Sequence, residues 1–161
     1  MKIIRGIFNR FVHLIARFSP GATTIRPFLH RLRGVKIYGR VFIGDDVYLE
    51  NECPECIEIH DQAQICLRST ITAHLRGAGK VIIEKKVFIG SGCVIASAVG
   101  KTIVIGEGAV VSAGSVITEN VAPFTMVAGV PAKPIAIVKT PMTLETEYDD
   151  FKKGIVPIKK R

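Results

Sequence analysis

The sequence predicts an all-β fold, a parallel β-helix preceded by a short helical segment, from three observations. Aliphatic residues recur at every sixth position from residue 37 onward. These hexapeptides group into triplets whose first members lie 22, 24 and 22 residues apart. The charge also divides near residue 37, because residues 1–36 contain eight basic and no acidic residues, whereas residues 37–161 contain 14 of each. A chain of 161 residues with 48% hydrophobic content suits one core-forming domain.

The first element is a predicted amphipathic helix over residues 2–18, ended by Ser19-Pro20-Gly21. Its apolar positions with helical spacing are Ile4, Phe8, Phe11, Ile15 and Phe18. A second amphipathic stretch runs from residue 25 to residue 32. Two interpretations are open. The apolar side packs on the domain or on a partner subunit, which is the commoner arrangement, or residues 2–18 contact an anionic membrane surface.

The repeat region follows, and a hexapeptide is long enough for one short strand and one tight turn. Three hexapeptides close a triangular coil, and stacked coils bury one column of aliphatic side chains. The predicted inward residues are Ile37, Ile43, Leu49, Ile59, Ile65, Ile71, Ile83, Ile89, Ile95, Ile105, Val111 and Ile117. Four residues after each lies a second, usually small or β-branched residue, expected at a crowded corner: Val41, Val47, Cys53, Ala63, Ser69, Leu75, Val87, Cys93, Val99, Ala109, Ser115 and Val121.

Several stretches resemble the hexapeptide-repeat acyltransferases, in the branch that O-acetylates sugars and small molecules. The matching stretches are Ile71-Thr72-Ala73-His74, residues 89–95, residues 105–118 and Ala128-Gly129-Val130-Pro131-Ala132-Lys133. The resemblance implies a left-handed coil, acetyl-CoA as co-substrate, and a homotrimer with active sites between subunits. We expect a helical segment at 1–34, the β-helix at 35–138 and a tail at 139–161 that straps a neighbour or is loose.

His74 is the predicted catalytic residue. Direct acetyl transfer needs a base that deprotonates the acceptor and then an acid that protonates the thiolate, and one histidine serves both roles. His74 should face away from the packed column, just before the chain leaves the regular coil through residues 75–80. The resembling enzymes have their catalytic histidine at such a place. His13 and His30 are expected at the surface or in packing, and His60 on a solvent-facing strand.

The resemblance also suggests binding residues. Asn51 corresponds to an asparagine that holds the acceptor in related galactoside acetyltransferases. For CoA it indicates Ser91, Ala113, Thr118 and Lys133, with Lys133 attracting the ribose phosphate as a point charge. Glu119 and Ala136 depart from the pattern, because related enzymes often have basic residues there.

No metal is expected. Cys53-Pro54-Glu55-Cys56 lacks the second ligand pair of a structural zinc site, and we expect Cys53 and Cys93 to be packing residues. The chain shows no signal peptide and no apolar run long enough to span a membrane, so a reduced, cytoplasmic location is expected, with a peripheral location at the inner membrane surface as the open alternative. The balanced charge of residues 37–161 argues against nucleic-acid binding.

The sequence therefore predicts an acetyl-CoA-dependent O-acetyltransferase acting on a sugar or surface-polysaccharide precursor. A serine or amino-sugar N-acetyltransferase is the alternative, because the same base serves hydroxyl and amine acceptors. A non-catalytic β-helix scaffold is also open. A carbonic anhydrase of the γ type ranks low, since no histidine follows His74.

Overall fold

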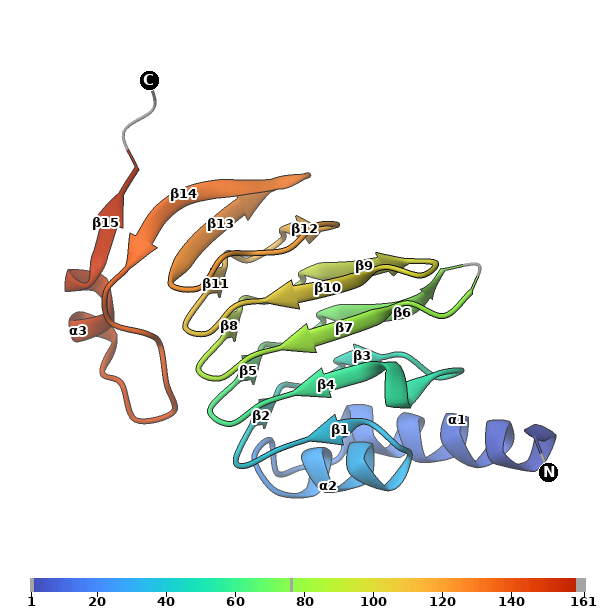
Figure 1. Ribbon diagram of the computed structural model, residues 1–161. Helices are drawn as coiled ribbons and strands as arrows, with labels where there is room; N and C mark the ends of the chain where they lie inside the picture. The colour runs from blue at the N-terminus through green and yellow to red at the C-terminus, as the bar shows by residue number, and fades with distance from the viewer. Residues whose placement is uncertain (1, 76, 159–161) are drawn as a thin grey trace.

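The computed structural model describes residues 2–75 and 77–158, and its body is a triangular prism of three parallel sheets (Figure 1). The first sheet contains β1 (Lys36–Ile37), β4 (Ile57–Ile59), β7 (Lys80–Ile83) and β10 (Thr102–Ile105). The second begins with β2 (Phe42–Ile43), β5 (Gln64–Ile65), β8 (Phe88–Ile89) and β11 (Val110–Val111). The third contains β3 (Tyr48–Leu49), β6 (Thr70–Leu75), β9 (Val94–Ala98) and β12 (Val116–Ile117).

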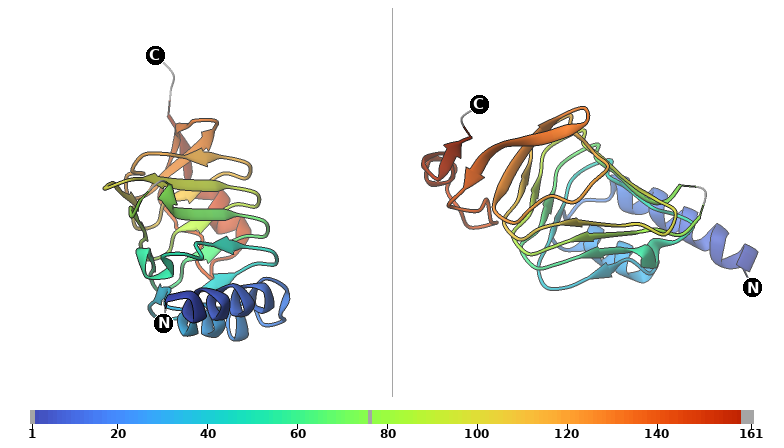
Figure 2. Two further views of the ribbon diagram at one scale, coloured as in Figure 1. Left: turned by 90° about the vertical axis from the view of Figure 1, so that its right-hand side faces the viewer. Right: turned by 45° about the horizontal axis from the view of Figure 1, so that its top comes forward.

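The strand register confirms the six-residue repeat. Ile37 pairs with Ile59, which pairs with Ile83, and Ile83 pairs with Ile105, so equivalent residues stack from coil to coil. All twelve predicted inward residues are buried, each at most 8% exposed. In Figure 1 the strands of the front sheet run to the left while successive coils rise, which makes the coil left-handed, and Figure 2 shows the stacked triangles from above.

The corner positions follow the prediction in the first two hexapeptides of each triplet, and in the third hexapeptide of the last triplet, where Val121 is 6% exposed. Val41, Ala63 and Ala109, for example, are fully buried. In the third hexapeptide of the first and third triplets, Cys53 is half-buried and Val99 is 56% exposed, so the expectation of a buried corner is wrong there. The reason is local: the chain leaves the coil at these places to begin its excursion to the next sheet. Leu75 is also a corner position of a third hexapeptide, but its side chain lies outside the described part.

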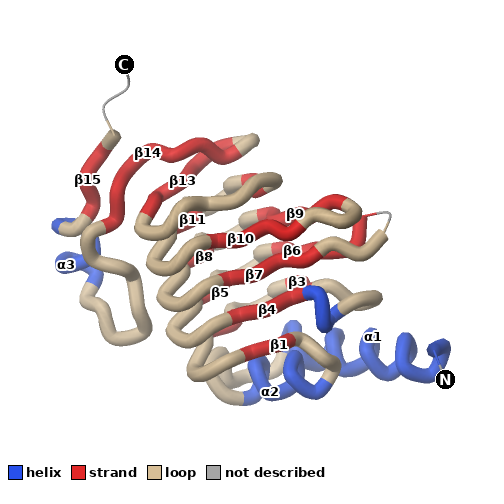
Figure 3. Tube along the Cα trace, viewed as in Figure 1, coloured by secondary structure: helices blue, strands red, loops and turns tan. Residues whose placement is uncertain are grey.

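Two helices close the lower end of the prism, α1 (Lys2–Phe18) and α2 (Ile25–Leu32), with the limits that the sequence predicts (Figures 1 and 3). The expectation that α1 packs its apolar side on its own domain is wrong. Its buried residues are Asn9, Val12, His13 and Ala16. We define the basal apolar face as the exposed large hydrophobic residues of both helices: Ile4, Ile7, Phe8, Phe11, Leu14, Ile15, Phe18, Ile25, Phe28 and Leu32.

A buried polar cluster explains why α1 turns this way. His13, His30 and Arg33 are each at most 2% exposed between the helices and the first coil. Arg33 Nη2 donates to the carbonyl of Leu49 at 3.0 Å and also to the carbonyl of Glu50. Burial, together with the charge of Arg33, lowers the pKa of His13 to about 4 and that of His30 well below its ordinary value. Burial likewise lowers the pKa of Arg33 to about 10.

The C-terminal region returns to its own β-helix. The second sheet continues through β13 (Thr125–Gly129), the antiparallel β14 (Ala132–Val138) and β15 (Ile155–Pro157), with α3 (Tyr148–Lys153) before the last strand. Gln64 Nε2 donates to the carbonyl of Met142 at 2.8 Å, and Arg40 forms an ion pair with Glu145. Residues 139–158 therefore pack against their own chain and are not a loose end. The last three residues of the predicted tail, Lys159, Lys160 and Arg161, lie outside the described residues.

Cys53 and Cys56 form a disulfide across the short 3-10 helix η1 (Pro54–Cys56). This differs from the expectation that Cys53 is a reduced packing residue, whereas Cys93 is buried as expected. The two cysteines are three positions apart in the segment between β3 and β4, where the chain leaves the regular coil. The hexapeptide pattern does not describe this segment, so it does not predict the disulfide. Among the residues described, no helix has the length and apolar character to cross a membrane.

Candidate functional site

His74 is the last but one residue of β6, just before the chain leaves the regular coil, which is the position that the sequence predicts. The N–H of Gly79 donates to the carbonyl of Ala73 at 2.7 Å, which closes the following loop, the His74 loop, at its base. Gly79 must be glycine, since a Cβ there would lie 2.5 Å from the carbonyl oxygen of Ala98. The pairing of β6 with β9 becomes irregular at the same point, and such irregularities re-aim side chains. His74 is thus a half-buried imidazole at an anchored strand end.

Glu50, which the sequence analysis missed, anchors the residue before His74. Glu50 is 6% exposed, and its carboxylate accepts backbone N–H groups from Asn51 at 2.8 Å, Glu52 at 3.0 Å and Ala73 at 3.3 Å. The last bond joins the first coil to the second directly below the His74 loop. One signal was available, because Glu50 follows the inward Leu49 at a position where glycine is common in this repeat.

The predicted acceptor residue Asn51 lies between the β-helix and its helical base. Its Oδ1 accepts from His13 Nδ1 at 2.6 Å and from Arg33 Nη2 at 3.1 Å, and its Nδ2 donates to the hydroxyl of Tyr48 at 3.4 Å. The carboxylate of Glu50 accepts the N–H groups of both Asn51 and Ala73, which brings Asn51 close to the residue before His74. Sequence reasoning missed His13 and Arg33 as the groups that orient this amide, since they are distant in the chain.

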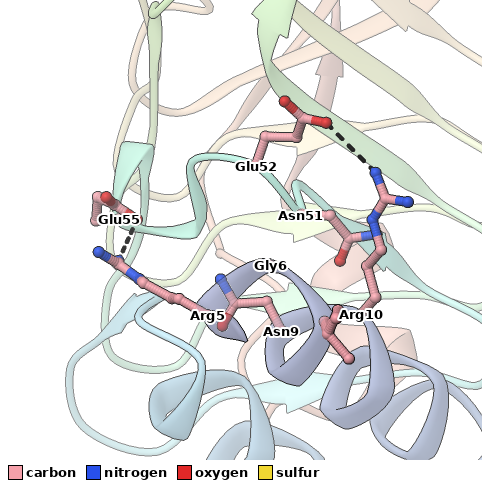
Figure 4. A pocket seen from close by; sticks show the side chains of 8 residues that line it. Arg5, Gly6, Asn9, Arg10, Asn51, Glu52 and Glu55 are labelled. Carbon is pink, nitrogen blue, oxygen red and sulfur yellow. Dashed lines mark hydrogen bonds and ion pairs between the residues drawn. The ribbon is translucent and has the colours of Figure 1, made fainter. Parts of the chain in front are cut away.

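Asn51 also lines a cavity of about 620 Å³ between α1 and the turn after β3. Figure 4 shows its charged walls, with Arg5 paired to Glu55 at 3.2 Å and Arg10 paired to Glu52 at 3.5 Å. A cavity of this size and polarity can hold a hydroxylated small molecule.

Ser91 and Ala113 lie in equivalent turns of neighbouring coils, at the corner that leads into the third sheet. The carbonyl of Ser91 accepts the N–H of Gly114 at 2.9 Å, which sets the spacing of the two coils. Gly90 permits this close approach, because a Cβ would lie 2.6 Å from the Ala113 nitrogen. Ser91 is half-buried and Ala113 is exposed, so the corner offers backbone groups and small side chains at the surface.

Thr118 and Lys133 line one cavity of about 300 Å³ at the end of the prism opposite the helices. Thr118 follows β12, and Lys133 lies on β14 opposite Ala128. Both side chains are exposed. Glu119 lines the same cavity, so one acidic and one basic group face it.

The structure brings the predicted residues together in pairs. Ser91 lies beside Ala113, Thr118 shares a cavity with Lys133, and Asn51 lies one coil below His74. His74 does not line either of the two cavities described above. Among the residues that the structure describes, the predicted base therefore shares neither of these two cavities with the predicted CoA residues.

His60, expected on a solvent-facing strand, directly follows β4 and is half-buried. Its Nε2 lies 3.0 Å from Glu58 Oε1, and its ring stacks on Tyr38. Over the described ranges 2–75 and 77–158, no three His, Cys, Asp or Glu side chains gather as a metal site would require.

Comparison with known sequences identifies the repeat. A family model described as the hexapeptide repeat of succinyl-transferase matches residues 80–119. The 2,3,4,5-tetrahydropyridine-2,6-dicarboxylate N-acetyltransferase of Staphylococcus aureus (strain bovine RF122 / ET3-1) is 42% identical over 79 residues, which is 49% of this chain. The enzyme of that name from Enterococcus faecalis is 44% identical over 70 residues, or 44% of this chain. This chain covers only 28% of either relative's length.

Solved structures share the architecture more fully. The polySia-specific acetyltransferase NeuO superposes with a TM-score of 0.58 at 25% identity, over 74% of this chain and 60% of NeuO. A hexapeptide-repeat-containing acetyltransferase of Vibrio cholerae O1 biovar eltor, crystallised with acetyl-CoA, gives 0.60 at 19% identity over 89% of both chains. A galactoside acetyltransferase in complex with CoA gives 0.58 at 18% identity, over 84% of this chain and 82% of that one. The chain therefore has the hexapeptide repeat and the β-helix fold of the hexapeptide-repeat acyltransferases.

Proposed function

We propose that the protein transfers the acetyl group of acetyl-CoA to a hydroxyl group of a sugar or surface-polysaccharide precursor. One observation supports this most strongly: Thr118 and Lys133, selected from the sequence for CoA, line the same cavity. The fold adds support, because acetyltransferases with this architecture have been crystallised with CoA or acetyl-CoA. NeuO, at 25% identity, acts on a sialic acid polymer by its name, which favours a saccharide acceptor.

The proposed assembly is a homotrimer with each active site between two subunits. His74 and the Thr118–Lys133 cavity are separate within one chain. A neighbouring subunit that presents its His74 loop to this cavity would unite them. Light scattering of the purified protein tests the assembly, and a monomeric mass for an active enzyme would contradict it.

In the proposed reaction His74 takes the proton of the acceptor hydroxyl. The hydroxyl oxygen attacks the thioester carbonyl carbon, and a backbone N–H of an adjacent coil stabilises the negative oxygen that results. The C–S bond then breaks, the C–O ester bond remains, and His74 returns its proton to the departing thiolate. The bond from Ala73 to Glu50 and the closed base of the loop keep His74 in place during both proton transfers.

Binding of the two substrates is assigned to opposite ends of the prism. Ser91 and Ala113 leave room for the pantetheine arm, while Thr118 and Lys133 bind the nucleotide end. Asn51 contributes to acceptor binding from the wall of the 620 Å³ cavity. If Lys133 attracts the ribose phosphate, Lys133→Ala weakens CoA binding about fivefold, on the scale of one exposed charge pair. It should leave binding of dephospho-CoA unchanged, and equal losses for both ligands would contradict this role.

The decisive experiment compares the wild type with His74→Ala and His74→Gln. Calorimetry measures acetyl-CoA binding, and thiol release over a panel of sugars measures transfer. We expect unchanged acetyl-CoA affinity and a rate lowered about 10²- to 10⁴-fold, the usual value of general acid–base catalysis. His60→Ala is the matched control, because His60 is also a half-buried histidine of the β-helix, directly after strand β4. Full activity in both His74 variants would exclude His74 as the base.

N-acetylation is a second candidate, favoured by the 42% identity to an N-acetyltransferase. The same panel should include amino sugars and amino acids. A preference for amines would replace the proposed acceptor class but retain His74. If the wild type binds no acetyl-CoA, the transferase proposal fails and the scaffold interpretation replaces it.

A further inference from the structure

The basal apolar face is the largest feature that the proposed function does not use. On α1, Ile4 is 73% exposed, Phe11 62% and Phe18 64%; on α2, Phe28 is 60% exposed. Both helices lie side by side at the lower end of the prism, beyond the first coil (Figures 1 and 2). A soluble monomer rarely displays so many large apolar side chains together, and such a surface marks an interaction site.

The orientation of α1 is fixed by its opposite side. At about 100° per residue, the exposed apolar residues of α1 fall within about 120° of arc, and Asn9, Val12, His13 and Ala16 lie across the helix from them. Arg5, Arg10 and Arg17 pair with Glu55, Glu52 and Asp46 of the first coil. Turning the apolar side inward would break these ion pairs and the contact of His13 with Asn51. The basal apolar face is therefore the outer surface of a helix whose polar side is bound to the first coil.

We propose that the basal apolar face binds an anionic lipid membrane, with α1 and α2 lying in the plane of its interface. The helices would insert their apolar residues about 5–10 Å into the headgroup and acyl boundary. Charge selects this occupant. Residues 1–36 contain eight basic residues and no acid. Four of them, Arg5, Arg10, Arg17 and Arg26, are paired with carboxylates of the first coil, and Arg33 is buried. Among the described side chains, Arg31 and Lys36 are the exposed basic residues that remain available to an anionic surface.

A second copy of the chain fits the same surface less well. Two basal faces in contact would bring two such basic segments together, and their charges would repel. An anionic lipid surface instead attracts each basic residue. The prism would then stand on the membrane with the Thr118–Lys133 cavity at its far end. This proposal does not depend on the proposed acetyl transfer.

Vesicle flotation tests the proposal with the full chain. One set of vesicles contains equal parts of phosphatidylcholine and phosphatidylglycerol, and the other contains phosphatidylcholine only. We expect the wild type to float with the anionic vesicles, less with the neutral ones, and less as salt is added. Phe11→Ser/Phe18→Ser should weaken binding to anionic vesicles at least about tenfold, since burial of a single phenylalanine is worth that much.

The matched control is Val130→Ser/Tyr148→Ser, which removes two large apolar residues, 72% and 64% exposed, far from the base. It should bind like the wild type, and both double variants should melt at the wild-type temperature. Equal binding of the two variants, or no binding of the wild type to anionic vesicles, would overturn the proposal. If light scattering finds an assembly that Phe11→Ser/Phe18→Ser dissociates, and vesicles do not bind, the face belongs to a second copy instead.

Discussion

The β-helix and the helical base bury their side chains by opposite rules. In the β-helix the aliphatic residues of every hexapeptide face inward, and even the end coils leave them at most 8% exposed. In α1 the side that faces inward contains Asn9 and His13, while Phe11 and Phe18 face outward. The difference shows that the repeat region is stabilised mainly by burial of apolar surface, whereas the base is held by hydrogen bonds and ion pairs.

The largest expected difference between the two regions is in the effect of removing an apolar side chain. Ile89→Ala should lower the free energy of unfolding by about 2–5 kcal/mol, because Ile89 is fully buried between Ile65 and Val111 in the stack. Ile7→Ala removes the same atoms from a residue that is 66% exposed, and should change the free energy of unfolding by less than about 0.5 kcal/mol. Urea unfolding measures both, and similar losses would refute the distinction.

Acid should destabilise the helical base, formed by α1 and α2, before it destabilises the β-helix. His13 has a pKa of about 4 in the folded protein and 6.5 as its ordinary value. As the pH falls below 6.5, His13 becomes protonated in the unfolded state but stays neutral in the folded state. The free energy of unfolding therefore decreases as the pH falls from 6.5 to about 4. The loss is about 3 kcal/mol, and the buried His30 acts in the same direction.

The pH dependence of the free energy of unfolding measures this effect, with His13→Gln as the comparison. Glutamine retains a donor for Asn51 but does not titrate. The free energy of unfolding of the variant should change less between pH 6.5 and about 4 than that of the wild type. An unchanged curve would assign the acid sensitivity to other groups.

Asn51 connects the two regions, so its replacement should affect stability and activity together. Asn51→Ala leaves His13 and Arg33 without a shared acceptor, which should cost about 1–3 kcal/mol of stability. It should also raise the KM for the acceptor. His13→Ala removes the same hydrogen bond from the other side, and should lower stability while leaving that KM near its wild-type value. An equal rise in KM for both variants would mean that Asn51 affects acceptor binding only by holding the two basal helices in place.

The repeat region was predictable because its information is local. A six-residue period identifies each inward residue without knowledge of the rest of the chain, and the three sheets with their register follow from it. The limits of α2 were predictable for the same reason. The corner positions failed only where the chain leaves the coil, at Cys53 and Val99.

The base and the site were less predictable because they depend on distant partners. A helical pattern reveals an apolar side of α1 but not that Asn51 and Arg33 would draw its polar side inward. Thr118 and Lys133 do share a cavity. Glu50 went unrecognised, because its role depends on Ala73 in the next coil. In the proposed trimer, the relation of His74 to the predicted CoA residues would depend on a second subunit, which no single-chain pattern describes.

The smallest expected effects lie on adjacent residues of α1 and test its orientation most directly. Val12 is 6% exposed and Phe11 is 62% exposed. Val12→Ala should cost about 1–2 kcal/mol of stability, since two buried methyl groups are removed. Phe11→Ala deletes far more apolar surface yet should change stability by less than about 0.5 kcal/mol. Thermal or urea unfolding of the two variants compares them. If Phe11→Ala is the more damaging, α1 covers the β-helix with its apolar side, and the proposed membrane surface does not exist in the folded protein.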